Sequence, residues 1–186
     1  IYLKNFSRLD KEKVSHFSVE SGLDSTLLLA NNLIKNRVKV VKDYAKVPMI
    51  SGSPSQINQV FLNLITNAVQ SIAPSQRDGL LHLSTRLDKR RSEIVVCISD
   101  NGVGIETDAL PYIFDPFFTT KAVGEGTGMG LSISYKIIKE HGGSLSVKET
   151  SSAGTTFEIR LPYEAATSSE GKQRPEAAAN ESLFVD

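Results

Sequence analysis

The spacing of apolar positions predicts two amphipathic helices in the first half of the chain. The first is expected in the run 19–38 with Ser18 as its N-cap. Its apolar positions recur every three or four residues, at Leu23, Leu27, Ala30 and Ile34. The second is expected to open at Pro54 and Ser55, since proline is tolerated in a first turn, and to run to about Ile72. Its apolar stripe is broader and consists of Ile57, Val60, Phe61, Leu64, Ile65 and Ala68.

Strand patterns follow these helices. Alternating or Val/Ile/Thr-rich segments occur at 38–44, 80–87, 93–100, 144–149 and 155–162. A short helical piece is expected near 107–113, and a third helix from Gly130 to about Glu140, where 141–143 (HGG) is typical of a helix end. The separation of strands from helices predicts an α/β (α+β) fold in the form of a two-layer sandwich.

Composition limits the possible functions. The 186 residues contain 21 Lys and Arg against 21 Asp and Glu, so no nucleic-acid or membrane surface is indicated. Cys97 lies in an apolar run and is expected in the core, and one Cys with three scattered His excludes a Cys/His zinc cluster. No apolar run is long enough to cross a bilayer and no signal peptide is visible, so this stretch is expected to be cytoplasmic.

The chain is expected to have three parts. Residues 1–15 are interpreted as the end of an upstream helix (1–10) and a polar connection, and residues 16–164 as the globular domain. Residues 165–186 have few large apolar side chains and are expected to form a flexible linker. Because the chain begins abruptly without Met, it is interpreted as a piece of a longer protein, whose membrane anchoring stays open.

Asn63 and Asn67 lie four residues apart in the second predicted helix and therefore share a face. Their amide oxygens can orient the water shell of Mg²⁺, which proteins hold through few ligands plus phosphates. An Asn pair that only forms hydrogen bonds along a helix surface is the alternative, and it is preferred unless other motifs support the metal site.

Asp100 ends a hydrophobic strand and is followed by Asn-Gly-Val-Gly. A carboxylate there can accept a hydrogen bond from an exocyclic amine such as that of adenine, and Gly102 and Gly104 let the backbone approach a flat base. An Asx turn at the end of a strand is the alternative.

Alternate glycines at 124, 126, 128 and 130 directly precede the third predicted helix. They place free N–H groups at a helix N-terminus, where phosphate is favoured. The pattern is neither a Walker loop, since no Gly-Lys-Ser/Thr follows, nor a dinucleotide fingerprint, since no strand directly precedes it. A surface loop is the alternative, although a lid must also move.

The segment 114–121 (FDPFFTTK) precedes these glycines. Its three phenylalanines are expected either to anchor a lid or to form a buried plug. Thr119, Thr120 and Lys121 offer hydroxyls and a cation near the phosphates, and a solvated lysine is the alternative for the last. The three histidines are interpreted as structural or exposed rather than phosphoaccepting: they are His16 in a polar connection, His82 in a strand and His141 at a helix end.

The ordered set resembles the ATP-binding domain of sensor histidine kinases, in the superfamily that also holds gyrase, the large heat-shock chaperone ATPases and MutL. NQVFLNLITNAVQSI is similar to the family's Asn box, DNGVGI and GEGTGMGL to its two Gly boxes, and FDPFFTTK to its Phe box. The resemblance covers about 18–163, with GTTFEIRLP as the last strand, and is greatest to kinases of the nitrogen-regulation type. It implies a Bergerat fold, with a mixed, mostly antiparallel sheet packed on about three helices.

The resemblance also implies a role for each matching residue. Asn67 would ligate Mg²⁺ with Asn63 assisting, and these two with Lys121 would be the catalytic positions. Asp100 would bond the adenine amine. The positions around the base would be Gly102, Gly104, Ile105 and Thr155. The positions near the phosphates and in the lid would be Gln70, Ser71, Thr120, Lys121, Gly124, Gly126, Thr127, Gly128, Met129, Gly130 and Leu131.

Two departures refine the expected activity. Hydrolytic members of the superfamily place a Glu where this chain has Asn63, and an amide is no general base, so water attack should be poor. The acceptor histidine should lie on an upstream helix that this chain does not contain. The resemblance therefore implies transfer of the ATP γ-phosphoryl group to a histidine and then to an aspartate of a response regulator, but no autophosphorylation by this piece alone.

The implied partners are ATP and ADP, the dimerisation and phosphoacceptor domain of the same kinase, and a receiver domain. The full-length protein is expected to be a homodimer. The final SLFVD is similar to the first strand of a receiver, which would make the parent a hybrid kinase. Three alternatives remain at this stage: an ATPase of the chaperone and gyrase branch, a Ser/Thr kinase of the anti-sigma type, and a scaffold that has lost nucleotide binding.

Overall fold

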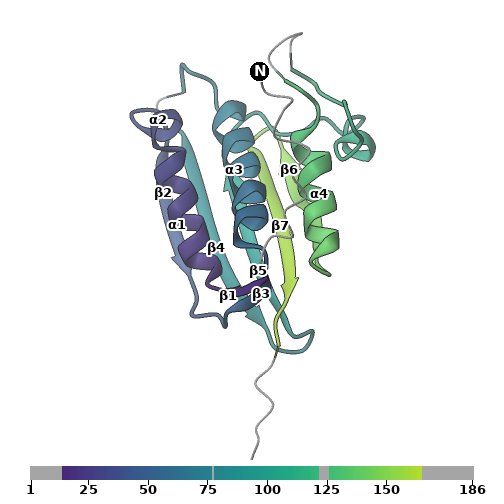
Figure 1. Ribbon diagram of the computed structural model, residues 1–186. Coiled ribbons are helices and arrows are strands. Elements are labelled where there is room, and N and C mark those ends of the chain that lie inside the picture. The colour runs from purple at the N-terminus through teal and green to yellow at the C-terminus, as the bar shows by residue number, and fades with distance from the viewer. Residues whose placement is uncertain (1–13, 77, 122–125, 165–186) are drawn as a thin grey trace, which may run out of the picture.

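The computed structural model describes residues 14–76, 78–121 and 126–164. The predicted helix end at 1–10, the linker and strand at 165–186, and Gly124 lie outside the described residues. The described chain forms a sheet layer and a helix layer (Figure 1). Its elements in order are β1 (Ser15–Phe17), α1 (Val19–Leu29), α2 (Asn31–Ile34), β2 (Lys39–Tyr44), β3 (Ile50–Gly52), α3 (Pro54–Ser71), β4 (Leu80–Asp88), β5 (Glu93–Asp100), the 3₁₀ turn η2 (Leu110–Tyr112), α4 (Gly130–Glu140), β6 (Ser144–Ser151) and β7 (Gly154–Pro162).

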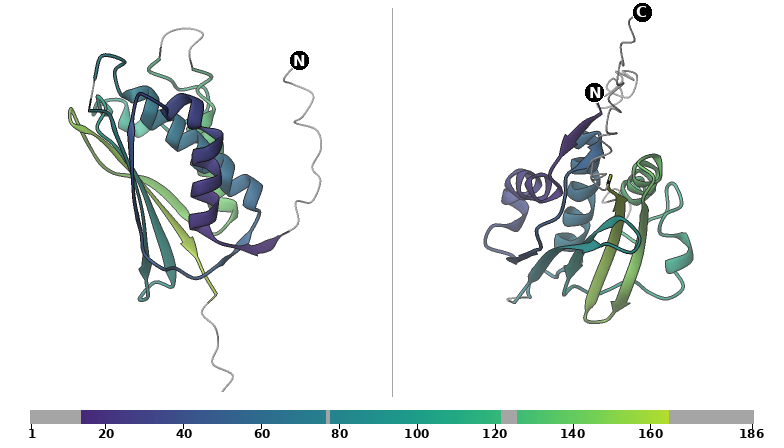
Figure 2. Two further views of the ribbon diagram at one scale, coloured as in Figure 1. Left: turned by 90° about the vertical axis from the view of Figure 1, so that its left-hand side faces the viewer. Right: turned by 90° about the horizontal axis from the view of Figure 1, so that it is seen from below.

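The main sheet has five strands in the order β2-β4-β5-β7-β6. Strands β2 and β4 are parallel, and every other neighbouring pair in this sheet is antiparallel. Helices α1, α3 and α4 cover one face of the sheet, and no helix of residues 14–76, 78–121 and 126–164 covers the other face (Figure 2). The predicted two-layer sandwich with a mixed, mostly antiparallel sheet is therefore confirmed.

The core lies between α3 and the central strands. Ser53 caps α3 by accepting from Gln56 N, and Pro54 occupies the first turn, as the sequence predicts. The stripe that includes Phe61 and Leu64 is fully buried, together with the β5 residues Ile94, Val96 and Ile98. Each such side chain contributes about 1.5–3 kcal/mol through burial, so α3 is fixed firmly against the sheet.

The structure differs from the sequence-based prediction near the N-terminal end. The single helix predicted for 19–38 is divided into α1 and α2, and α1 ends at the cap residue Ala30. The predicted polar connection overlaps β1, which pairs with β3 in a separate two-stranded sheet. Strands of only three residues carry too little alternation to be visible in a sequence pattern.

Helix α4 runs beside α3 (Figure 1), and hydrogen bonds at each of its two ends hold it there. At the C-terminal end of α4, the Nε2 atom of His141 accepts a hydrogen bond from Ser53 N at 3.0 Å, while its Nδ1 lies 2.8 Å from the Ile137 carbonyl oxygen. This bonding requires a proton on Nδ1 and a bare Nε2. His141 is therefore structural, as predicted, and it ties the end of α4 to the start of α3.

Cys97 is 5% exposed and reduced, which agrees with its predicted burial, although it faces away from the main hydrophobic cluster. Among the described residues, no helix has both the length and the apolar character needed to cross a membrane.

Candidate functional site

Three of the sequence motifs meet at one edge of the domain. The C-terminal half of α3 carries Asn63 and Asn67, β5 ends at Asp100, and α4 begins at Gly130. The end of α3 and the start of α4 lie at the same edge of the helix layer (Figure 1). Segments that are far apart in the sequence therefore come together, as the motif interpretation requires.

Asp100 is half-buried and is oriented by the residues around it. Its Oδ1 accepts from Gly102 N at 2.8 Å and lies 2.9 Å from the Ser71 hydroxyl. A Cβ at position 102 would lie 2.0 Å from Ser71 Oγ, so only glycine lets this loop pass so close to α3. These two contacts both engage Oδ1, and the Thr155 backbone provides a further hydrogen bond to the carboxyl.

The environment of Asp100 also changes its acidity. Burial raises the pKa of this carboxyl above its ordinary value. Hydrogen bonds from Gly102 N, the Ser71 hydroxyl and the Thr155 backbone act in the opposite direction on the pKa but are outweighed. A partly desolvated carboxylate is a strong acceptor for an amine that replaces its lost water.

The loop after Asp100 is fixed by side chains that sequence reasoning did not select. Asn101 Oδ1 accepts from Leu80 N at 2.7 Å, which holds the loop to β4. Thr150 Oγ1 accepts from Ile105 N at 2.8 Å and lies 3.0 Å from Thr155 Oγ1. Asn101 stands inside the DNGVGI motif and could have been found there, whereas nothing in the local sequence of β6 marks Thr150.

Asn67 and Gln70 present amide oxygens on one face of α3. Lys121 Nζ donates to Asn67 Oδ1 at 3.3 Å and also to Gln70 Oε1. The described residues contain no group of three or more His, Cys, Asp or Glu side chains that could hold a metal ion. Neutral amide oxygens suit Mg²⁺ only when phosphates supply the negative charge, so the donor set fits a metal that arrives with a nucleotide.

Asn63 contacts α4. Its Nδ2 donates to the Gly130 carbonyl oxygen at 3.2 Å and to Ser134 Oγ at 3.2 Å, which ties the start of α4 to α3. Ser134 is fully buried. It lies four residues after Gly130 and so faces the same side of α4, and this spacing could have indicated in the sequence that it contacts Asn63. Asn63 therefore orients α4, in addition to any role towards a ligand.

The N-terminus of α4 lacks the cap found in the other long helices. Ser18 and Ser53 accept from backbone N–H groups of α1 and α3, whereas the α4 cap residue Met129 forms no such side-chain bond. The first N–H groups of a helix need an acceptor, and a phosphate supplies both oxygens and favourable charge. The start of α4 is therefore suited to bind an anion.

The residues before α4 are linked to the Phe-containing segment. Phe117 N donates to the Gly128 carbonyl oxygen at 2.9 Å. Gly128 has φ +63°, and a Cβ there would lie 2.4 Å from the Phe117 backbone. Phe114 and Phe118 pack against the core, while Phe117 is 73% exposed. Two of the three phenylalanines thus contact the core, and the third is exposed.

The remaining predicted positions fall into three groups. Gly104 and Ile105 lie in the loop after Asp100, as expected for the surroundings of a base. Thr120 and Thr127 are exposed, and Leu131 packs against the core. Ser71, which is expected near the phosphates, has its hydroxyl 2.9 Å from Asp100 Oδ1.

Comparison with known proteins agrees with this geometry. The family described as "Histidine kinase-, DNA gyrase B-, and HSP90-like ATPase" matches residues 52–165. The sensory histidine kinase/phosphatase NtrB of Rhizobium leguminosarum bv. phaseoli is 33% identical over 158 residues, which cover 78% of this chain and 40% of that protein. Sporulation kinase C of Bacillus subtilis (strain 168) is 34% identical over 139 residues, which cover 74% of this chain and 31% of that protein.

Solved structures show the same fold. The nucleotide-free catalytic domain of histidine kinase ThkA matches with a TM-score of 0.69 and 25% identity, over 81% of this chain and 95% of that domain. ShkA, solved in complex with AMPPNP, matches with a TM-score of 0.71 and 22% identity, over 83% of this chain and 32% of that chain.

The chain thus spans less than half the length of these two curated relatives. The family match includes the α3 amides, Asp100 and α4 in one continuous segment. The chain belongs to the histidine kinase-, DNA gyrase B- and HSP90-like ATPase family, as an ATP-binding domain homologous to those of sensor histidine kinases.

Proposed function

We propose that this chain is the catalytic domain of a two-component sensor histidine kinase that uses Mg²⁺-bound ATP. The main support is the convergence of a half-buried carboxylate, the α3 amide oxygens and the uncapped start of α4 at one edge. These groups match the amine, the metal-bound phosphates and the phosphate oxygens of ATP respectively. The relatives are named as sensor kinases, which supports the same role for the parent protein.

In this proposal Asp100 selects adenine. Its carboxylate accepts from the exocyclic amine, while Ser71 and Gly102 hold Oδ1 in place. Gly104, Ile105 and Thr155 lie around the base. A guanine, whose corresponding position is a carbonyl, would face the carboxylate with acceptor against acceptor and should bind poorly.

The phosphate end is assigned to Asn67, Lys121 and the start of α4. Mg²⁺, when bound, would neutralise charge on the phosphates, with Asn67 as its protein ligand and Asn63 and Gln70 nearby. Lys121 lies beside Asn67, where its ammonium group would offset negative charge on the phosphates. Gly126, Thr127, Gly128, Met129 and Gly130 supply backbone around them, and Gly124 is assigned the same role from its motif position alone.

Phosphoryl transfer, rather than hydrolysis, is the proposed reaction. A histidine nitrogen from another part of the kinase attacks the γ-phosphorus and ADP leaves, after which an aspartate of a response regulator takes the phosphoryl group. Asn63 supports this choice, because its amide binds Gly130 and Ser134 and cannot deprotonate water. Steady ATP hydrolysis that Asn63→Ala abolishes would instead support an ATPase.

The wider organisation is also proposed. Residues 16–164 form the catalytic domain, residues 1–15 connect it to a dimerising helix pair that carries the acceptor histidine, and residues 165–186 link it to a following receiver. Such a parent acts as a homodimer and as a phosphoprotein. The domain works on the cytoplasmic side, where ATP and response regulators are present.

Two measurements test the proposal. Isothermal titration with ADP and a non-hydrolysable ATP analogue should show binding that Mg²⁺ strengthens, and no binding at millimolar nucleotide would refute it. Mixing the chain with ATP and the histidine-bearing part of the parent should yield an acid-labile phosphoprotein. An acid-stable product would indicate a Ser/Thr kinase of the anti-sigma type.

A further inference from the structure

The end of the site assigned to adenine is bounded by the turn that joins β6 to β7. Gly154, at the start of β7, passes so close to the Asp100 carbonyl oxygen that a Cβ there would lie 1.9 Å from it. A Cβ at Gly104, in the loop after Asp100, would lie equally close to the Ser151 carbonyl oxygen. The two strands therefore contact the DNGVGI segment at two places, both on residues that the proposed function assigns to the base.

Thr150 on β6 and Thr155 on β7 lie opposite each other beside this turn. Their hydroxyl oxygens are 3.0 Å apart. Thr150 Oγ1 also accepts a hydrogen bond from Ile105 N at 2.8 Å, whereas the Thr155 backbone forms a hydrogen bond to the Asp100 carboxyl. This pair of hydroxyl groups thus joins the loop residue expected to line the base to the strand residue that bonds the carboxylate.

The position of the Ile105 backbone depends on the Thr150 hydroxyl. Thr155 is buried and Ile105 packs against the hydrophobic core, so solvent has little access to the groups that Thr150 contacts. A hydroxyl has two lone pairs and one proton, so Thr150 can accept from Ile105 N and share a second hydrogen bond with Thr155. Without this hydroxyl the Ile105 N–H loses its acceptor, and the loop has to move until the N–H finds another.

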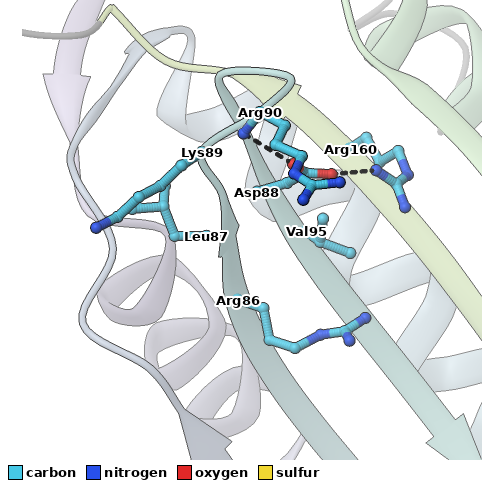
Figure 3. A pocket seen from close by; sticks show the side chains of 7 residues that line it. All are labelled: Arg86, Leu87, Asp88, Lys89, Arg90, Val95 and Arg160. Carbon is cyan, nitrogen blue, oxygen red and sulfur yellow. Dashed lines mark hydrogen bonds and ion pairs between the residues drawn. The ribbon is translucent and has the colours of Figure 1, made fainter.

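The opposite end of β5 is stabilised in a different way. A shallow hollow of about 450 Å³ lies there at the β4–β5 hairpin, and Figure 3 shows Asp88 bonded to Arg160 within it. Glu93 and Glu158 also pair with Arg160, at 3.2 and 2.7 Å, so its charge is balanced within the sheet. These contacts stabilise the hairpin and join strand residues to one another, whereas the contacts of Thr150 lead to two groups of the proposed nucleotide site.

We propose that Thr150 is a positioning residue for adenine, whose hydroxyl holds Ile105 and Thr155 in place around the base without contacting the nucleotide itself. This inference rests on the proposed function and deepens it, because it adds a residue of β6 to those that determine affinity for the base. Loss of the hydroxyl should weaken adenine binding. Asn67 and Lys121, which are assigned to the phosphates, bond each other and should stay in place.

The test compares two substitutions by titration of the whole chain with ADP. Thr150→Val removes the hydroxyl and keeps the branched shape, and it should weaken ADP binding by about ten-fold, because a backbone donor loses its acceptor. Thr150→Ser keeps the hydroxyl and should bind ADP within about two-fold of the unmodified chain. Unchanged affinity in Thr150→Val overturns the proposal. An equal loss in both variants also overturns it, since the shape of the side chain rather than its hydroxyl would then matter.

Two further measurements separate positioning from a general effect on stability. AMP should lose affinity for Thr150→Val by the same factor as ADP, because both nucleotides carry the same base. A loss seen with ADP alone would place the effect at the phosphates and overturn the proposal. Hydrogen exchange of the Ile105 amide in the nucleotide-free chain should be faster in Thr150→Val and unchanged in Thr150→Ser. Unchanged exchange in both variants would show that the amide does not depend on this hydroxyl, which also overturns the proposal.

The matched control is Thr156→Val, the same change one residue beyond Thr155 and on the other face of the sheet. The Thr156 hydroxyl lies 2.9 Å from Ser99 Oγ and 3.5 Å from Glu149 Oε1, so its removal also costs hydrogen bonds. ADP binding should be unchanged in this control, and a loss equal to that of Thr150→Val would overturn the proposal. If the unmodified chain does not bind ADP, the proposed function fails and this inference with it; if it binds ADP and Thr150→Val binds equally well, this inference alone fails.

Discussion

Replacing Asp100 with asparagine separates nucleotide recognition from stability. Asn keeps an oxygen that can accept from Gly102 N and the Ser71 hydroxyl, which now lie 2.8 and 2.9 Å from Oδ1. The amide NH₂ would then face the adenine amine with donor against donor. Loss of one charge-assisted bond costs about 1.5–3 kcal/mol, or about 10- to 150-fold in affinity, equally for ADP and ATP.

The same substitution, which weakens nucleotide binding, should not lower the stability of the folded protein. Because burial raises the pKa of Asp100 in the folded state, the folded protein binds its proton more tightly than the unfolded chain does. The contribution of this carboxyl to stability is therefore present at low pH and is lost as pH rises from the ordinary value of 3.8 through the raised one. At neutral pH, Asp100→Asn should leave the melting temperature unchanged or higher.

Calorimetric titration and thermal denaturation on the same samples measure both effects. Asp108→Asn, an exposed change of the same charge, should alter neither. In the unmodified protein, nucleotide affinity should fall as pH drops through the raised pKa of Asp100, and the variant should lack this dependence. A variant that loses affinity and stability together would show that Asp100 serves the fold and would refute the assignment to adenine.

Three further changes test other parts of the site. Lys121→Met should weaken metal-free ATP binding more than Mg²⁺-dependent binding, because Lys121 is a cation held by the Asn67 amide oxygen; equal losses would argue otherwise. Gly128→Ala forces a side chain into a backbone with φ +63° and should cost about 1–2 kcal/mol in chemical denaturation, so an unchanged midpoint would contradict the contact at that glycine. Ser71→Ala removes one donor to Asp100 and should shift the pH midpoint of ADP binding upward, and a shift downward would exclude the hydrogen bond.

Sequence periodicity was sufficient for the elements that bury a full face. The stripe on α3 and the alternating or Val/Ile/Thr-rich runs of β4, β5, β6 and β7 each extend over eight or more residues, so their types and approximate limits could be predicted. The strands β1 and β3 have three residues each and depend on pairing with one another, which no local pattern encodes. The break between α1 and α2 was missed for a similar reason, since the apolar spacing continues through it.

Contacts within the site could be predicted from the sequence where both partners lie in the same short motif. Asp100 and Gly102 are two residues apart, and their hydrogen bond follows from the local turn. The contact from Ser71 to Asp100 joins residues 29 positions apart, and it depends on how closely the loop passes α3. Partnerships of this kind arise from packing, so the local sequence around Ser71 does not indicate that its hydroxyl contacts Asp100.

The two tethers of α4 restrict how this domain can report its ligand. Asn63 holds one end of the helix through Gly130, and Ser53 holds the other through His141. Helices α3 and α4 should therefore move as one rigid unit, without shifting relative to each other, when nucleotide binds or leaves. Spectroscopic labels on the exposed side of α4 should give little signal on loading, whereas a label at Phe117 should distinguish the empty domain from the occupied one.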